Sequence, residues 1–125
     1  MVSSKKLSIV AAFKIYGAKL ARRWPVSAIA DDGALVVSCS ETHFHMGMRY
    51  IDALSNWEVD NPSGRDLLRR HLDEAQREGK IVRVVIAHGS QSDVRAAQYF
   101  HVRPDLIGRV AAFDGDSFSI EFNKA

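Results

Sequence analysis

Cysteine, proline and long apolar runs are all scarce in this 125-residue chain. The single cysteine, Cys39, cannot form an intrachain disulfide, which excludes a small secreted domain held together by such bonds. The longest apolar run, from Ile9 to Phe13, is far shorter than the roughly 20 residues that a membrane-spanning helix needs. The N-terminus also lacks the basic start and apolar stretch of a secretion signal. We therefore expect a cytoplasmic protein with no membrane partner.

Neither sign of charge is in large excess. The chain has 17 Lys and Arg residues against 15 Asp and Glu residues, which gives a formal net charge of +2. This near balance excludes a highly basic tail for binding nucleic acid, although a local basic face is still compatible with it. With 46% hydrophobic and 26% charged residues, the composition is that of a folded globular protein. The length predicts a single domain over residues 1–125.

Two segments have the pattern of β-hairpins. In the first, Val26 to Ala30 and Ala34 to Ser40 flank an Asp-Asp-Gly sequence that suits a tight turn. In the second, Ile107 to Phe113 and Ser117 to Phe122 flank an Asp-Gly-Asp turn, and apolar residues alternate with polar ones along the final strand.

Between the hairpins the sequence predicts a helix and a buried strand. Arg65 to Glu78 places apolar residues on one helical face and opposite charges four residues apart on the other, and Gly79 follows as a stop signal. Ile81 to Ala87 is rich in β-branched residues, which is typical of a strand covered on both faces. We expect an α+β domain in which the two hairpins and this central strand form one sheet, with the amphipathic helix packed on one face.

Other segments are less regular. Apolar residues at steps of three and four favour a helix from Ser4 toward Arg22, and a strand over Leu7 to Tyr16 is the alternative. The pattern also allows a short helix over Tyr50 to Trp57 and another over Asp93 to Phe100.

Cys39, His43 and His45 are candidate metal ligands. In an extended segment, two histidines separated by one residue point to the same side, where their ring nitrogens could bind one transition metal. The spacing matches no standard zinc pattern, and the alternative interpretation is an ordinary thiol on a strand with two partly exposed histidines on a loop.

Two further patterns bear on catalysis. Asp60, Glu78 and Lys80 resemble an acidic residue followed by Glu-x-Lys, a set that can bind a divalent ion, but helix termination at Gly79 also explains them. The sequence from His88 to Ser90 follows the buried strand, where a ligand crevice is a recurrent arrangement in α/β sheets. Without a G-x-S-x-G elbow, Ser90 is better interpreted as a helix cap than as a nucleophile.

Basic residues occur in an early group and a late group. If folding brings the groups together, they could contact phosphates, while Trp24, Tyr99 or Phe100 could stack on bases. The alternative is a solvated rim of long side chains that cover apolar surface. The candidate phosphate contacts are Lys14, Lys19, Arg22, Arg23, Arg95, Arg103 and Arg109.

Part of the chain carries a family resemblance. The stretches Phe13-Lys-Ile-Tyr-Gly-Ala-Lys-Leu and Trp24-Pro-Val-Ser-Ala-Ile-Ala-Asp-Asp-Gly-Ala-Leu-Val-Val-Ser resemble the start of small, poorly characterised bacterial proteins associated with mobile-element and restriction-type loci. The resemblance covers about a third of the chain and brings no catalytic residues with it. It implies a role connected with nucleic acid.

Together these observations predict a non-catalytic module, without a cofactor, that binds DNA or RNA through phosphate contacts. The alternative is a protein-interaction module that forms a homodimer through an exposed hairpin edge. A third hypothesis is a small metal-dependent enzyme with its site at Cys39, His43 and His45.

Overall fold

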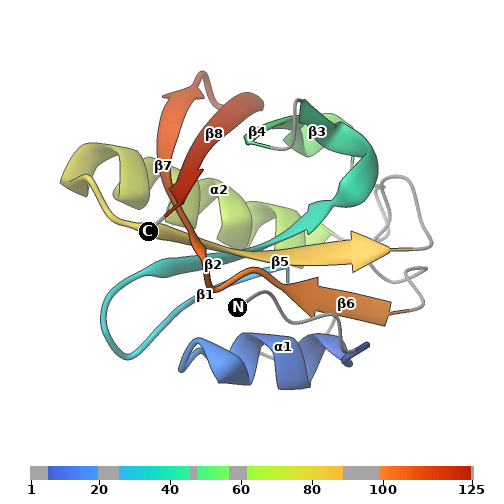
Figure 1. Ribbon diagram of the computed structural model, residues 1–125. Helices are drawn as coiled ribbons and strands as arrows, with labels where there is room; N and C mark the ends of the chain where they lie inside the picture. The colour runs from blue at the N-terminus through green and yellow to red at the C-terminus, as the bar shows by residue number, and fades with distance from the viewer. Residues whose placement is uncertain (1–5, 20–25, 46–47, 57–61, 89–98, 125) are drawn as a thin grey trace.

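The computed structural model describes residues 6–19, 26–45, 48–56, 62–88 and 99–124. In this part of the chain, two helices and an eight-stranded mixed sheet form a single α+β domain, as the sequence predicts in outline (Figure 1). The sheet has the strand order β1-β2-β5-β7-β8-β4-β3, and β6 pairs with β5 beside β7. None of the helices described is long and apolar enough to cross a membrane.

Both predicted hairpins are confirmed. Strands β1 (Ser27–Ile29) and β2 (Leu35–Ser40) are antiparallel and joined by the Asp-Asp-Gly turn. Strands β7 (Leu106–Phe113) and β8 (Ser117–Lys124) form the second hairpin. The predicted central strand is also confirmed, because β5 (Val82–His88) pairs along its length with β2 on one side and with β6 and β7 on the other.

The predicted amphipathic helix is α2 (Pro62–Glu78), which begins three residues earlier than the sequence pattern indicates. It buries Leu68, Leu72 and Ala75 against the sheet. The helix ends at Gly79, whose φ of +65° is accessible to glycine at little cost, and the Lys80 amide donates to the Ala75 carbonyl at 3.0 Å.

Three predictions of local structure need correction. The N-terminal helix α1 spans only Ile9–Ile15, because Ser8 caps its start and Gly17, with a φ of +77°, follows its end. The expected helix over Tyr50 to Trp57 is wrong, since β4 (Arg49–Ala53) and the 3₁₀ turn η2 (Leu54–Asn56) occupy that segment. The helix expected over Asp93 to Phe100 lies largely outside the described residues, but its last two positions belong to strand β6 (Tyr99–Val102).

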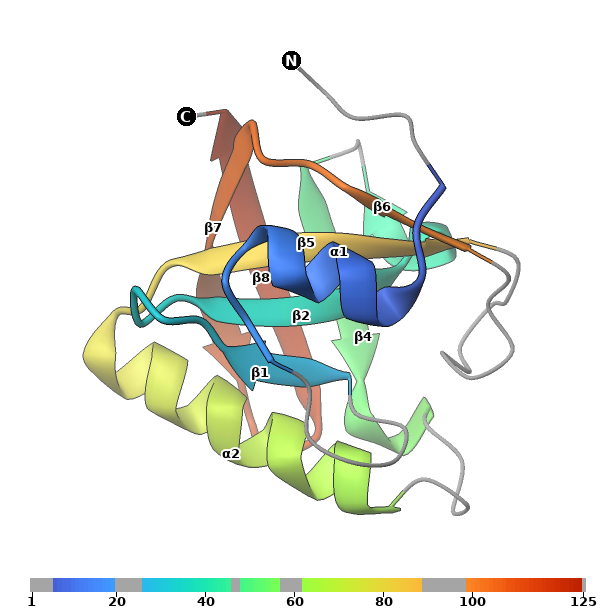
Figure 2. The ribbon, with the colours of Figure 1, turned by 90° about the horizontal axis from the view of Figure 1, so that it is seen from below.

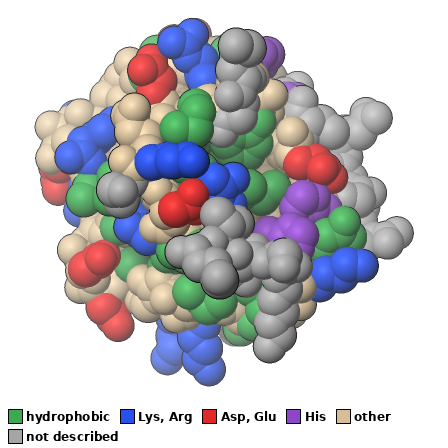
Figure 3. All heavy atoms as spheres, in the orientation of Figure 1, with side chains coloured by type: hydrophobic (Ala, Val, Ile, Leu, Met, Phe, Trp, Pro, Cys, Tyr) green, Lys and Arg blue, Asp and Glu red, His purple; other side chains and the backbone are tan. Residues whose placement is uncertain are grey.

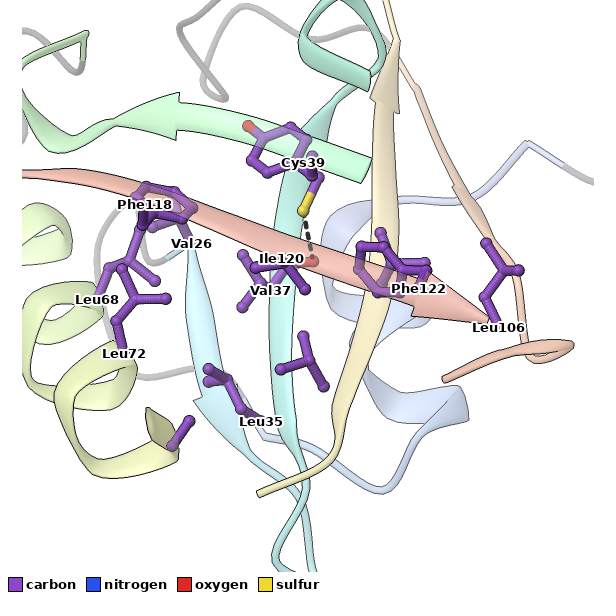
Figure 4. Packing of buried hydrophobic residues seen from close by; sticks show 14 of the residues in the cluster. Val26, Leu35, Val37, Cys39, Leu68, Leu72, Leu106, Phe118, Ile120 and Phe122 are labelled. Atoms are coloured by element: carbon purple, nitrogen blue, oxygen red, sulfur yellow. Dashed lines mark hydrogen bonds between the residues drawn. The ribbon is translucent and has the colours of Figure 1, made fainter. Parts of the chain in front are cut away.

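The two faces of the sheet carry separate hydrophobic cores. On one face, α2 packs against β7 and β1; Figure 4 shows Leu68 and Leu72 of the helix beside Phe118 of β8, in the same core cluster. On the other face, α1 buries Ala12 and Phe13 against β2, β5 and β6. Figure 2 shows α1 lying over β2 and β5, whereas β7, β8 and β4 run across the direction of these strands. The sheet therefore bends around the larger core.

The bend brings β4 close to the end of β2. The last β2 residue is followed by the 3₁₀ turn η1 (Glu41–His43) and the two-residue strand β3 (Phe44–His45), which pairs with β4. Contacts of η1 with both β4 and β5 place this turn between the two parts of the sheet.

Candidate functional site

The candidate site lies where the two parallel strands of the sheet end. Ser40 of β2 is in register with Ala87 of β5, so the next residue on each strand, Glu41 or His88, reaches the same edge. Carboxyl ends of parallel strands are a common place for ligand sites, because side chains of neighbouring strands converge there without being needed for the core. The hydrophobic clusters indeed contain neither Glu41 nor His88.

Strand β6 adds two more aromatic rings to this edge. Its antiparallel register with β5 pairs His88 with Tyr99 and Ile86 with His101. The rings of His88 and Tyr99 stack with centroids 4.9 Å apart and planes 11° apart, and the His101 ring meets His88 edge-on at 4.5 Å. Alternation along β6 turns its other two residues, Phe100 and Val102, into the core beneath α1. The same strand therefore supplies both core and site.

A chain of close polar contacts joins the two histidines to Glu41. The distance from His88 Nδ1 to Glu41 Oε1 is 3.1 Å, and that from His88 Nε2 to His101 Nδ1 is 2.8 Å. An ionised carboxylate only accepts hydrogen bonds, so a neutral His88 that faces it with a donor carries its proton on Nδ1 and accepts at Nε2. In that tautomer, His101 donates from Nδ1 to His88.

The chain is partly open to solvent and lies between charges of opposite sign. The His88 side chain is 17% exposed and that of Glu41 is 46% exposed. Lys6 is held next to β6 by the backbone pairing of Leu7 with Phe100, and its Nζ lies 4.7 Å from the centre of the Tyr99 ring. Figure 3 shows histidine side chains at the surface with an acidic side chain beside them and a basic one below.

A buried polar pair lies behind Glu41. The Tyr50 hydroxyl of β4 donates to Asp52 Oδ2 at 2.5 Å and accepts from the Ser40 amide at 3.2 Å. Burial, followed by the nearby Cys39 and Asp52, raises the pKa of Tyr50 well above its usual value. Burial also raises the pKa of the Cys39 thiol, so this cysteine remains a protonated core residue.

Four of the predicted phosphate contacts lie within the described residues. Lys14 and Lys19 are exposed at α1 and just after it, and Arg109 is exposed on β7. Arg103 is already engaged: its guanidinium donates to both carboxylate oxygens of Asp105 at 2.9 and 2.8 Å and holds the pKa of Asp105 at about 2. The remaining candidates, Arg22, Arg23 and Arg95, lie outside the described residues.

The candidate metal ligands are not brought together as a set. Cys39 faces the core from β2, and its thiol lies 3.9 Å from the Val37 carbonyl oxygen (Figure 4). His43 lies in η1 with its ring edge toward Tyr50, and His45 is exposed on β3. Within the described ranges, no group of three or more His, Cys, Asp or Glu side chains is placed to hold a metal ion.

The other two sequence patterns have different outcomes. Lys80 Nζ lies 3.6 Å from carboxylate oxygens of both Glu78 and Glu74 and 3.4 Å from the Gly33 carbonyl, so it ties the end of α2 to the β1–β2 turn. These residues border a pocket of about 320 Å³ at the end of the sheet opposite the histidines. Asp60 and Ser90 lie outside the described residues.

Sequence reasoning placed His88 at a potential ligand crevice but did not assemble the chain around it. Two local signals were present: a histidine at the last position of a buried strand, and the alternation of Tyr99 with His101. Comparison of this chain with protein-family models, curated proteins and solved structures found no match to any of them. The functional argument therefore depends on the site itself.

Proposed function

We propose that Glu41, His88 and His101 form the acid–base site of a small enzyme that cleaves RNA. The observation that carries this proposal is the series of close polar contacts from the Glu41 carboxylate through both imidazoles, at the carboxyl edge of β2 and β5. Histidine suits such a role because its ordinary pKa lies close to neutral pH.

The chain can take up a proton at one end and stabilise the resulting charge at the other. When the His101 ring takes up a proton, its Nδ1 proton can pass to His88 Nε2 across the 2.8 Å contact. His88 is then an imidazolium whose Nδ1 lies 3.1 Å from the Glu41 carboxylate. The transfer reverses when His101 releases the proton to solvent, so the chain returns to its starting state after each turnover.

RNA fits this chemistry because it carries its own nucleophile. The His101 ring takes the proton of a 2′-hydroxyl, the 2′-oxygen bonds to the adjacent phosphorus, and the bond from phosphorus to the 5′-oxygen breaks. The departing 5′-oxygen takes a proton from solvent, which leaves a 2′,3′-cyclic phosphate and a 5′-hydroxyl. Lys6 can face the phosphate charge, and the Tyr99 ring offers a surface on which a base can stack.

Cleavage of a labelled single-stranded RNA tests this proposal. We expect metal-independent cleavage in EDTA, with an uncleaved DNA strand of the same sequence as the substrate control. His101→Ala should reduce the rate by about 100-fold or more, the usual contribution of a positioned acid or base. The matched control is His45→Ala, which removes an exposed histidine outside the chain and should leave the rate unchanged. Equal rates for the wild type and His101→Ala would refute the assignment.

Binding without cleavage is the second candidate function, and the exposed lysines at α1 favour it. Retention of RNA or DNA in a gel-shift series, weakening steeply with salt and lost in Lys14→Ala/Lys19→Ala, would support a non-catalytic module. A homodimer formed by strand addition is the further alternative. The outermost strands β1 and β3 have only three and two residues, so such an interface would have few backbone hydrogen bonds. A concentration-independent monomer mass in light scattering would exclude it.

A further inference from the structure

The polar pair formed by Tyr50 and Asp52 is unusual in its position. Tyr50 is fully buried and Asp52 is 6% exposed, and both point from β4 into the larger core. A carboxyl group removed from water is costly unless hydrogen bonds compensate it. Asp52 accepts the Tyr50 hydroxyl proton at Oδ2 and the Ala53 amide proton at Oδ1. A phenylalanine at position 50 would fill the same core volume without requiring this arrangement.

The hydroxyl has a second partner that connects it to the histidine chain. It accepts the backbone amide proton of Ser40, and the next residue in the chain is Glu41. The aromatic ring of Tyr50 also meets the His43 ring edge-on, with centroids 6.2 Å apart. Tyr50 therefore contacts the residue before η1 and the last residue of η1.

This anchoring matters because η1 has little structure of its own. A 3₁₀ turn of three residues makes few internal hydrogen bonds, and its position is set by its neighbours. Glu41 must remain close to His88 Nδ1 if the His88 proton is to stay on that nitrogen. A displacement of about 1 Å at such a contact can cost as much as 100-fold in rate.

We propose that Tyr50 and Asp52 are positioning residues: Asp52 fixes the Tyr50 hydroxyl, and this hydroxyl fixes the turn that holds Glu41 against His88. The consequence for catalysis rests on the proposed acid–base function, whereas the effect on the geometry of His88 does not. Groups that face His88 are Glu41 from η1, His101 and Tyr99 from β6, and Lys6 through the Tyr99 ring.

The nitrogen-15 chemical shifts of the His88 ring measure its tautomer directly. In the wild type we expect the proton on Nδ1, because this nitrogen donates to Glu41. Glu41→Gln should increase the Nε2-protonated form, and Tyr50→Phe should move the population in the same direction. The matched control is Tyr16→Phe, which removes a hydroxyl that also has two backbone partners, the Val84 carbonyl and the Arg103 amide, far from η1. It should leave the tautomer of His88 as in the wild type.

RNA cleavage gives a second readout. Tyr50→Phe should lower kcat by about tenfold with little change in KM, since the positioned contact acts on proton transfer rather than on substrate binding. Melting curves of both tyrosine variants show whether they are folded. If Tyr50→Phe does not fold, Asp52→Asn takes its place, because it keeps the tyrosine and the side-chain volume while removing the carboxylate.

The outcomes separate the two proposals. If Glu41→Gln changes the tautomer but the folded Tyr50→Phe or Asp52→Asn protein does not, the positioning role is wrong and the histidine chain stands. If Glu41→Gln leaves both the tautomer and the cleavage rate unchanged, the chain itself fails and the proposed function fails with it. A shift in Tyr16→Phe equal to that in Tyr50→Phe would show a general loss of packing and would overturn the positioning role.

Discussion

A methyl group at position 108 should destabilise the fold at the point where the sheet bends. Gly108 of β7 pairs with Val82 of β5 and with Phe122 of β8, so it lies where the strand passes from one part of the sheet to the other. A Cβ atom there would lie 2.6 Å from Cδ1 and Cε1 of Phe122 and 3.1 Å from Cγ2 of Ile120. Phe122 is 2% exposed, so its ring lies within the packed core.

The size of the effect follows from two opposing contributions. Overpacking a filled core costs about 1–3 kcal/mol. Replacing glycine by alanine also restricts the unfolded chain, which returns about 0.4–1 kcal/mol. The expected net loss for Gly108→Ala is therefore about 1–2 kcal/mol, which corresponds to a fall of about 4–8 °C in the melting temperature for a chain of this size.

Thermal melting followed by circular dichroism measures this change, and a second substitution tests its cause. Phe122→Leu removes the ring atoms that the new methyl group would meet, at the cost of a cavity. The double variant should therefore be more stable than the sum of the two single effects predicts, by about 1 kcal/mol. Arg109→Ala is the control, because its exposed side chain lies next to Gly108 and should change stability by less than about 0.5 kcal/mol. Additive effects in the double variant, or an unchanged melting temperature in Gly108→Ala, would refute the reasoning.

Three further predictions concern stability. Leu72→Ala should cost about 2–5 kcal/mol in urea unfolding, because the side chain is fully buried between α2 and the sheet, and a loss below about 1 kcal/mol would contradict this packing. Burial lowers the pKa of His71, whose Nδ1 lies 2.8 Å from the Ser27 hydroxyl; the unfolded state thus binds more protons, and stability should fall as the pH drops below about 6.5. His71→Gln should reduce that dependence, and an identical pH profile of the urea midpoint in the two proteins would contradict the assignment. Burial raises the pKa of Tyr16 to about 12, so its contribution is present below about pH 10 and is lost as the pH rises toward 12, which a comparison of urea midpoints with Tyr16→Phe at pH 9 and 11 would reveal.

The parts of the fold that sequence analysis predicted are those whose signals are local. Each hairpin has its turn residues between two alternating segments, and α2 has an apolar face, paired charges and Gly79 at its end. The ion pair between Asp73 and Arg77 forms at 3.0 Å as the spacing predicts, whereas Asp66 pairs with Arg69 rather than with the expected Arg70. Local patterns therefore predict the type of an element more accurately than they predict the partner of an individual side chain.

Strand β4 shows why other elements escaped prediction. Its residues do alternate between buried and exposed, but the hydrophobic pattern is reversed at two neighbouring positions: Ile51 is 41% exposed and Asp52 is 6% exposed. A pattern search that places apolar residues inside cannot recognise such a strand. The partner of Asp52, the Tyr50 hydroxyl, is what makes the inward carboxyl tolerable, and that contact exists only in the folded chain.

The candidate site escaped prediction for a related reason. Glu41 reaches His88 through the parallel register of β2 with β5, and His101 reaches it through the antiparallel register of β6 with β5. A change of one residue in either register would turn a side chain to the other face of the sheet. Neither register can be read from one sequence. The predicted phosphate track depended on tertiary placement in the same way, and one of its described members, Arg103, is paired with Asp105.

The position of the histidine chain also explains how the fold can carry it. Core residues hold strands β2, β5 and β6 in place. The positions of the strand ends therefore do not depend on contacts between the site residues. The site also requires that η1 hold Glu41 near His88. With three residues, η1 makes too few internal hydrogen bonds to fix its own orientation. The buried hydroxyl of Tyr50 reaches the start of that turn from the strand that the bent sheet brings over it. The bend at Gly108 and the hydrogen-bonded chain at His88 are therefore linked: without the bend, β4 would not come close to the end of β2, and Glu41 would lack its anchor.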